Sequence, residues 1–502
     1  MEGKTAFPGT EGIRIGFAKA DISPCVKTGE GFRRPLETRC AAIAARNFTS
    51  VIISCDLIEL DPDYNRTLQE AVSGILKIPA DNVLIHTTHT HTSPWLRGEG
   101  GIPVLAGLDK ILSMCALDAL SAAVPCRVKS GRTDAGKRLN VNRRGDAGPE
   151  LGIQTYWFGY RYDPATDRAD ASPLVNEMRR RWLGEKPESV PGPEPVWFDG
   201  PVDQLVQSML FQDQNGATIG SIVRFSAHPH IASACRDRLL DPDYPARVRD
   251  AIEDRYGGIC LFLLGPSANM VPKEHISYYF DQESFPQKVY LGPTSSLYPE
   301  SDTAAVDEMD RIGEGIAQAA AEGLEAVRCQ TLEECRFITR KFRVELDPAL
   351  IEDEEQKEAL QRILEAEYEA FRRAGGPLRE IRRLANRMNW LEWAAGNWYN
   401  FIARKDRDAG FKNMPLAALR INQTVLVFLH SEIAAETTFA LRKAYPGLDL
   451  MTVSLTGGCL NYLPPDSFID EGGYEGRAVL AARGSEEKLR RDAGKLLEEL
   501  GL

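Results

Sequence analysis

The chain has 502 residues, of which 43% are hydrophobic and 26% charged, and its formal net charge at pH 7 is −12. These proportions are typical of a globular enzyme, and the length allows a large core and more than one folding unit. Because an acidic chain has no overall attraction for phosphate backbones or anionic lipid, nucleic acid and membrane surfaces are excluded as predicted partners, which leaves a small-molecule substrate.

The sequence predicts a cytoplasmic protein with no membrane span. Its first twelve residues, MEGKTAFPGTEG, have no apolar core of the kind found in signal peptides. No apolar run approaches the ~20 residues that cross a bilayer. The ten cysteines are scattered and form no CxxC pair. We therefore expect buried, reduced thiols rather than disulfides or a cysteine metal site.

The first third of the chain predicts a βαβ unit. Residues 51–56 are expected to form a buried strand, 61–77 a helix with an acidic start, and 82–86 a second strand. A strand, a helix and a strand at this spacing favour a parallel pair of strands. The next helix is expected at 103–124.

The middle of the chain begins with weakly periodic sequence. Residues 134–202 are rich in Gly, Pro, Arg and Asp, so we expect long loops that provide substrate contacts. Strands then resume at 218–226 and 259–264, and helices are expected at 244–255 and 304–326. This alternation again favours a helix-flanked sheet.

The last third contains a predicted insertion. Two charged, helix-periodic runs between residues 351 and 405 indicate a helical hairpin, with 346–414 as its bounds. After it, we expect β-rich sequence at 417–429, followed by further elements: a helix at 434–444, a strand at 449–455 and a helix at 485–500. The prediction is an α/β protein with a mixed, largely parallel sheet core flanked by helices. Its main domain comprises 1–345 and 415–502.

Five of the seven histidines fall in two short groups, HTTHTH (86–91) and HPH (228–230). Each group directly follows a predicted strand. Because ligands of open α/β sheets bind outside the carboxyl ends of strands, the two groups are expected to converge. Neutral imidazole is the commonest zinc ligand, so the pattern predicts a metal site around His89 and His228, with Zn²⁺ as the favoured ion.

The histidines next to these two have predicted roles of their own. Residues two apart on extended backbone point the same way, so His91 is expected beside His89, either as a ligand or as a carrier of protons. The same relation holds between His230 and His228. A structural role is predicted for the remaining histidines: His86, His275 and His430.

Two imidazoles need oxygen partners to complete a zinc site. The candidates at strand ends are Asp56, Asp243 and Glu432. Glu432 follows the clearest late strand, TVLVFL, and ranks first. Asp56 is alternatively expected to orient a ligand histidine, and Asp243 to cap the following helix.

Eight motifs, in the same order along residues 14–476, resemble those of the neutral/alkaline ceramidase family. The family pattern G-x-x-x-x-D-I-[ST]-P resembles GFAKADISP (16–24), and its HTHSGP resembles HTHTSP (89–94). Further along, its NR, HP, DYPG, QGxxGDxxP, PGE and GY…YEG resemble, in turn, NRR (142–144), AHPH (227–230), DYPA (243–246), LGPSANMVP (264–272), HSE (430–432) and NYLPPDSFIDEGGYEG (461–476).

The resemblance implies a complete set of site residues. The family's zinc ligands are two His, a Glu and a Tyr, which fall by motif on His89, His228, Glu432 and Tyr462. Its other functional residues fall on three more positions: His91, Arg143 and Tyr474. Tyr462 and Tyr474 are twelve residues apart, as in the family.

The sequence also departs from the family pattern. The family's Gly-Asp is Ala268-Asn269 here, PGE is HSE, and DYPG is DYPA. Residues after 476 predict one helix and not the β-sandwich that full ceramidases carry. We therefore expect the metal site without activity on membrane ceramide.

The predicted function is that of a zinc-dependent hydrolase that cleaves an amide (N-acyl) or related acyl bond with a metal-activated water. Two alternatives stay open at this point. The first is a metal-dependent lactone or phosphoester hydrolase, for which two metal ions would be diagnostic in the phosphoester case. The second is an inactive family member that binds a ligand.

Overall fold

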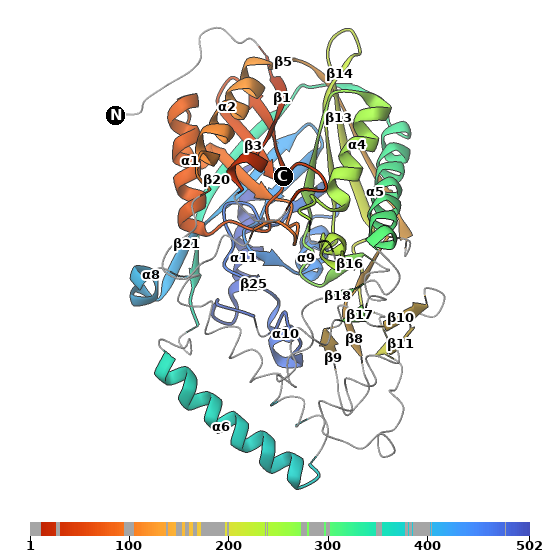
Figure 1. Cartoon of the computed structure of the whole chain (residues 1–502). Coiled ribbons are helices and arrows are strands. Elements are labelled where there is room, and N and C mark those ends of the chain that lie inside the picture. Colours follow the sequence, from red (N-terminus) through yellow and green to blue (C-terminus); the bar gives the residue numbers. More distant parts are fainter. Residues whose placement is uncertain are drawn as a thin grey trace.

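The computed structural model describes residues 12–26, 31–94, 105–136, 139–146, 200–235, 239–272, 302–347, 354–376, 404–476 and 478–502, with short stretches between some of them. Three sheets with flanking helices form the main body of this part of the chain, and smaller sheets accompany them (Figure 1). The molecule is an α/β protein, as expected.

The first sheet has the strand order β4-β3-β2-β1-β5. It is formed by β1 (Arg14–Asp21), β2 (Glu37–Ala44), β3 (Thr49–Cys55), β4 (Val83–Thr87) and β5 (Val124–Pro125). Two helices, α1 (Pro62–Leu76) and α2 (Leu108–Ser121), share one apolar core with one face of this sheet. Helix α1 begins where expected because Asp61 caps it, accepting from the backbone amides of Asp63 and Tyr64.

The second sheet has the order β15-β14-β13-β6-β19. Its strands are β6 (Arg127–Asp134), β13 (Leu205–Gln212), β14 (Thr218–Phe225), β15 (Ile259–Leu264) and β19 (Gln330–Thr331). Helices α4 (Tyr244–Tyr256) and α5 (Asp302–Glu325) pack on it and on each other, on the side of the molecule opposite α1 and α2 (Figure 1).

The third sheet has the order β20-β21-β22-β24. Its strands are β20 (Cys335–Glu345), β21 (Phe411–Ile421), β22 (Thr424–Phe428) and β24 (Asp449–Val453). Helices α9 (Ala435–Ala444) and α11 (Ser485–Glu499) complete this layer. The predicted elements at 51–56, 61–77, 82–86, 218–226, 259–264 and 485–500 are thus all present, with ends shifted by one or a few residues.

The same order of elements occurs once in each sheet. An antiparallel hairpin (β2-β3, β13-β14, β21-β22) is followed by a helix (α1, α4, α9) and then by a strand parallel to the second hairpin strand (β4, β15, β24). Short turns join only antiparallel strands, whereas a helical crossover brings the chain back in parallel. Most strand pairs are therefore antiparallel, and the sheets are less parallel than the largely parallel core that the sequence suggested.

The inner faces of the three sheets meet in one shared core. Phe17 from the first sheet, Phe211 from the second and Phe428 from the third belong to this single apolar cluster. At the carboxyl ends of the strands that border this core, the Leu264 amide donates to His86 Nε2 over 3.0 Å. The Leu264 carbonyl accepts from the Ser454 amide over 2.9 Å. The parallel strands β4, β15 and β24 therefore end close together, and the loops after them share one space.

Shorter elements surround this edge. The strands are β7 (Asn140–Asn142), β8 (Arg144–Asp146), β9 (Ile153–Thr155), β10 (Tyr160–Asp163), β11 (Arg168–Ala171), β12 (Val196–Trp197), β16 (Met270–Pro272), β17 (Tyr279–Phe280), β18 (Ser296–Leu297), β23 (Glu432–Ile433) and β25 (Tyr462–Leu463). Five of them, β8 to β12, form a small sheet within 134–202, where the sequence predicted loops. Strands of two to four residues are too short to show a period in the sequence.

The helical insertion is only partly within the described residues. Helix α6 (Glu354–Arg373) and the short α8 (Arg404–Ala409) lie in the predicted range, whereas most of the second predicted helix falls outside the residues described. Because β20 and β21 pair directly, the chain leaves and re-enters the third sheet at neighbouring strands. An insertion between these strands stays a proposal, and its predicted end at 414 overlaps the third sheet, because residues 411–414 are the first residues of β21.

Two further findings concern the cysteines and the helices. The ten cysteines all lie in the described part of the chain, where none forms a disulfide, and eight of them are buried. Among the described residues, no helix is long and apolar enough to cross a membrane.

Candidate metal centre

His89 lies in the loop after β4, on a strained backbone. Its φ of 68° is in the left-handed region, which non-glycine residues rarely adopt. Its amide donates to the Leu57 carbonyl over 2.9 Å, and its Nδ1 lies 2.6 Å from the Ile58 carbonyl. Nδ1 must carry the proton to donate to a carbonyl, so Nε2 faces the site with its lone pair available to a metal.

His228 lies in the loop after β14 and is held in the same way. Its Nδ1 lies 2.6 Å from the Ser267 carbonyl and 3.2 Å from that of Met270, and its own amide donates to the Met270 carbonyl over 2.9 Å. The main chain of the loop after β15 therefore sets the tautomer and the orientation of this ring, and Nε2 again points into the site.

Glu432, at the start of β23, joins the two imidazoles. Its Oε2 lies 3.1 Å from His228 Nε2 and 3.3 Å from His89 Nε2. The three side chains come from segments that follow strands of three different sheets, and all are at least nine-tenths buried. Burial alone would raise the pKa of Glu432, but the two neighbouring imidazoles hold it well below its usual value. The carboxylate is therefore an anionic partner for a cation at this point.

The pKa values of the two imidazoles are shifted in opposite directions. Burial lowers the pKa of His89, but the Glu432 carboxylate outweighs burial and the pKa lies above its usual value. Burial and the positive charge of Arg143 lower the pKa of His228 to about 4. A neutral His228 fits a metal ligand, since a ligand imidazole must give up its Nε2 proton.

Tyr462 lies directly beside Glu432. Strand β25 pairs in parallel with β23, with Tyr462 opposite Glu432. Asn461 before it and Ser431 before Glu432 both have positive φ, 63° and 65°. The backbone strain at both positions indicates that the two loops are held in shape for this pairing. Arg143 Nη2 donates to the phenol oxygen of Tyr462 over 3.0 Å.

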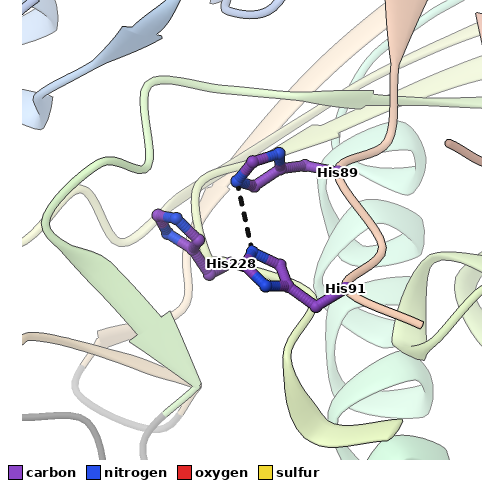
Figure 2. Close-up of side chains that lie close together, drawn as sticks. All are labelled: His89, His91 and His228. Carbon is purple, nitrogen blue, oxygen red and sulfur yellow. Dashed lines mark hydrogen bonds between the residues drawn. The ribbon is translucent and has the colours of Figure 1, made fainter. Parts of the chain in front are cut away.

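His91 completes a group of three histidines in this space (Figure 2). Its Nε2 lies 3.4 Å from His89 Nε2, and the ligand atoms of His89, His91 and His228 lie within 4.8 Å of one another. The His230 ring packs edge-on against His91, with ring centroids 3.9 Å apart. The two histidine groups of the sequence therefore converge, as expected.

Tyr474 packs against Tyr462. The two rings meet edge to face, with centroids 5.2 Å apart. The Tyr474 amide donates to Thr155 Oγ1 over 2.8 Å, and the Thr155 hydroxyl donates to the carboxylate of Glu475. Tyr474 is half-buried and packs against the small apolar cluster that contains Tyr462 and Phe468.

The remaining candidate residues have structural roles. Asp56 binds Arg249 through both carboxylate oxygens, over 2.7 and 2.8 Å, and accepts from Thr88 beside His89. Among the contacts of the described residues, Asp56 meets no ligand imidazole, so these contacts do not support a direct orienting role. Asp243 caps α4, as the alternative interpretation predicted.

Two of the three histidines with predicted structural roles lie within the described residues. His86 accepts from the Leu264 amide, and its Nδ1 lies 3.1 Å from Ser54 Oγ. His430 is fully buried, with its Nδ1 2.7 Å from Ser431 Oγ. Both side chains are fully buried, which fits the structural role that the sequence suggested. His275 lies outside the described residues.

Sequence reasoning missed several residues near the site. Glu59 and Cys459, both buried, have ligand atoms within 4.8 Å of the Glu432 carboxylate. Neither stands in a recognisable spacing, so no signal in the sequence marks them. Glu475 was also missed, although it directly follows Tyr474 in the YEG motif.

One departure from the family pattern has a structural explanation. Asn269 replaces the family's acidic residue, and its Nδ2 donates to both oxygens of Glu436, over 2.9 and 3.1 Å. Its Oδ1 accepts from the Ala435 amide over 3.0 Å. An aspartate here would place a second carboxylate against Glu436, so the amide suits this neighbour.

Comparison with solved structures identifies the fold. The structure is similar to that of neutral ceramidase from Pseudomonas aeruginosa, with a TM-score of 0.61 and 16% identity, covering 97% of this chain and 74% of that one. The chain has the neutral ceramidase fold. A second solved structure, a ceramidase complexed with C2, gives a TM-score of 0.60 and 15% identity, covering 97% of this chain and 75% of the other.

These similarities confirm the resemblance seen in the motifs at the level of the fold. A scan against models of protein families finds no match, and neither does a search among curated proteins. With identities this low, the ceramidase fold fixes the arrangement of the chain, and the chemistry rests on the residues of the site.

Proposed function

We propose that the protein is a zinc-dependent hydrolase that cleaves an amide, or N-acyl, bond of a small molecule. One observation carries the proposal: Glu432 Oε2 lies within 3.3 Å of the Nε2 atoms of both His89 and His228, while both Nδ1 atoms are held by backbone carbonyls. Two imidazoles and a carboxylate, fixed in this way, form a set of donors suited to zinc.

The types of donor atom support zinc as the ion. His89, His228, Glu432 and Tyr462 would supply two nitrogen and two oxygen donors, and each comes from a loop after a strand of one of the three sheets or from the β23–β25 pair. When bound, zinc supplies a Lewis acid and lowers the pKa of a bound water toward about 7.

The other residues have proposed roles around the reacting bond. His91, half-buried and next to His89 Nε2, moves the proton to the leaving amine. Tyr474 donates from its hydroxyl to the carbonyl oxygen on which charge develops. Arg143, beside Tyr462, holds a polar or anionic part of the substrate.

The proposed substrate is an N-acyl compound other than membrane ceramide. The ceramidases with this fold support amide cleavage as the type of reaction. We propose that the insertion at 346–414 and the segment 134–202 shape the specificity, because both extend from the strand ends around the site. We also propose a reducing compartment such as the cytoplasm, since the described cysteines form no disulfide.

Metal analysis and a substrate screen test the proposal. The purified protein is expected to contain one zinc per chain by elemental analysis, to lose activity on chelation and to regain it with zinc. Among N-acyl, ester, lactone and phosphoester compounds, N-acyl compounds are expected to be cleaved fastest. Faster lactone or phosphoester cleavage, or a protein that contains no metal and cleaves nothing, contradicts the proposal and favours the corresponding alternative.

A further inference from the structure

Glu475 is a fully buried carboxylate next to the candidate metal centre, with no assigned role. It follows Tyr474 in the chain and lies at the junction of three segments: the NRR stretch, strand β9 and the loop after α10 (Asp466–Glu471). A buried carboxylate is costly unless several donors satisfy it, so its partners show what it holds in place.

The first partner of Glu475 is Arg143. Arg143 Nε donates to Glu475 Oε1 over 2.7 Å, while Arg143 Nη2 donates to the Tyr462 phenol oxygen over 3.0 Å. One planar guanidinium thus joins the buried carboxylate to the tyrosine. Because the guanidinium is rigid, fixing its Nε edge also fixes the direction of Nη2.

The second oxygen of Glu475 holds the other tyrosine. Oε2 accepts from the Thr155 hydroxyl and from Arg144 Nη1, the latter over 3.2 Å. Thr155 Oγ1 in turn accepts the Tyr474 amide over 2.8 Å. The same carboxylate therefore sets the position of Arg143 through one oxygen and that of the Tyr474 backbone through the other.

The electrostatics agree with this geometry. Burial raises the pKa of Glu475, but Arg143 and Arg144 outweigh burial and hold the pKa below its usual value. Glu475 therefore stays ionised beside the two arginines. Arg144 has further partners in the Gly472 carbonyl and in Glu471, and it stacks on the Phe468 ring.

We propose that Glu475 is a positioning residue for the metal centre, which holds the Arg143 guanidinium against the phenol oxygen of Tyr462 and so fixes this phenol as a ligand. The inference rests on the proposed function, since it concerns the same centre. It predicts that Glu475 affects zinc binding through Tyr462 and not through the general stability of the fold.

A double-mutant cycle on zinc affinity tests this. Zinc affinity is measured by competition with a chelator, which requires no substrate, for the wild type, Glu475→Gln, Tyr462→Phe and the double variant. Glu475→Gln is expected to weaken zinc binding 10- to 100-fold, the usual range for residues that orient a ligand. In the Tyr462→Phe background the same substitution is expected to change the affinity by less than about twofold, because the two residues act as one unit.

Glu471→Gln is the matched control. Glu471 also pairs with Arg144, over 2.8 Å, but it lies at the surface and contacts neither Arg143 nor Tyr462 in the described contacts. Its substitution is expected to leave zinc affinity within about twofold of the wild type. If Glu475→Gln fails to fold, Glu475→Asp retains the charge with a shorter reach and is expected to weaken binding by several-fold.

Each outcome separates the inference from the proposed function. Equal losses in both backgrounds, or no loss in either, overturn the role of Glu475 and leave the zinc hydrolase intact. A wild type that binds no zinc overturns both. A purely structural role would lower the melting temperature of Glu475→Gln and weaken zinc equally with and without the Tyr462 hydroxyl.

Discussion

The two sides of the candidate metal centre are held by different kinds of contact. On the histidine side, the main chain orients the rings, because the Nδ1 atoms of His89 and His228 meet carbonyls of Ile58 and Ser267. On the tyrosine side, side chains do so, through Arg143 and Glu475. The histidine side should therefore tolerate substitution of its neighbours, whereas the tyrosine side should respond to changes several contacts away.

Removing a ligand of the histidine side is expected to have the largest effect. His228→Ala, and separately His89→Ala, should abolish zinc binding and lower turnover to less than about one-thousandth, because no acidified water remains. Zinc content, activity and circular dichroism are measured together. A folded His228→Ala protein that keeps both zinc and activity would break the assignment of this side.

Acid should lower the stability of the fold through His86, a histidine outside the centre. Burial lowers the pKa of His86 to about 3, and its Nε2 accepts from the Leu264 amide. The unfolded chain binds the proton at a higher pH than the folded one. This contribution to stability is therefore complete above pH ~6.5 and is lost as pH falls toward 3, with an upper limit of about 5 kcal/mol.

The variant His86→Gln isolates this contribution. Its amide oxygen replaces the acceptor for Leu264 but does not titrate in this range. Urea unfolding between pH 7 and pH 4 should show a steeper loss of stability in the wild type than in the variant. Parallel curves would show that His86 does not sense acid.

On the tyrosine side, Tyr474→Phe should keep the metal and lose rate. Removal of one donor to a developing oxyanion typically costs about 10²- to 10³-fold in turnover. Zinc affinity should stay at the wild-type level, because Tyr474 is placed by its backbone amide and by ring packing. Loss of zinc in this variant would indicate that Tyr474 is itself a ligand and would contradict its assignment as a hydrogen-bond donor.

The smallest effect on zinc affinity is expected for a residue whose backbone carbonyl, and not its side chain, orients a ligand histidine. Ser267 orients His228 through its carbonyl, which Ser267→Ala retains. Zinc affinity should therefore change by no more than about twofold. A tenfold loss, comparable with that expected for Glu475→Gln, would show that side chains hold the histidine side as well.

Much of the centre could be predicted from the sequence, because most of its residues directly follow recognisable strands. His89, His228 and Glu432 each follow a recognisable strand, so the rule that ligands gather at strand ends was enough to bring them together. Tyr462 follows no strong strand, and only its motif marked it. Ring orientation was not predictable, because it depends on carbonyls of Ile58 and Ser267, and backbone carbonyls leave no trace in residue identity.

The fold was predicted element by element but not in its arrangement. The hydrophobic runs located β3, β14 and β15. The antiparallel pairing of β13 with β14, and of β21 with β22, depends on tight turns that the periodicity of the strands does not report. The meeting of three sheets in one core is a long-range property and could not be inferred from any local stretch.

The repeated hairpin, helix and parallel strand has a consequence for how the protein matures. Each copy delivers only part of the donor set: His89 from the first, His228 from the second, Glu432 from the third. No fragment that carries one or two copies has a complete binding site. With the proposed ligands, capture of the ion would require all three copies to be docked together, and a bound metal would then report that the whole molecule has been assembled.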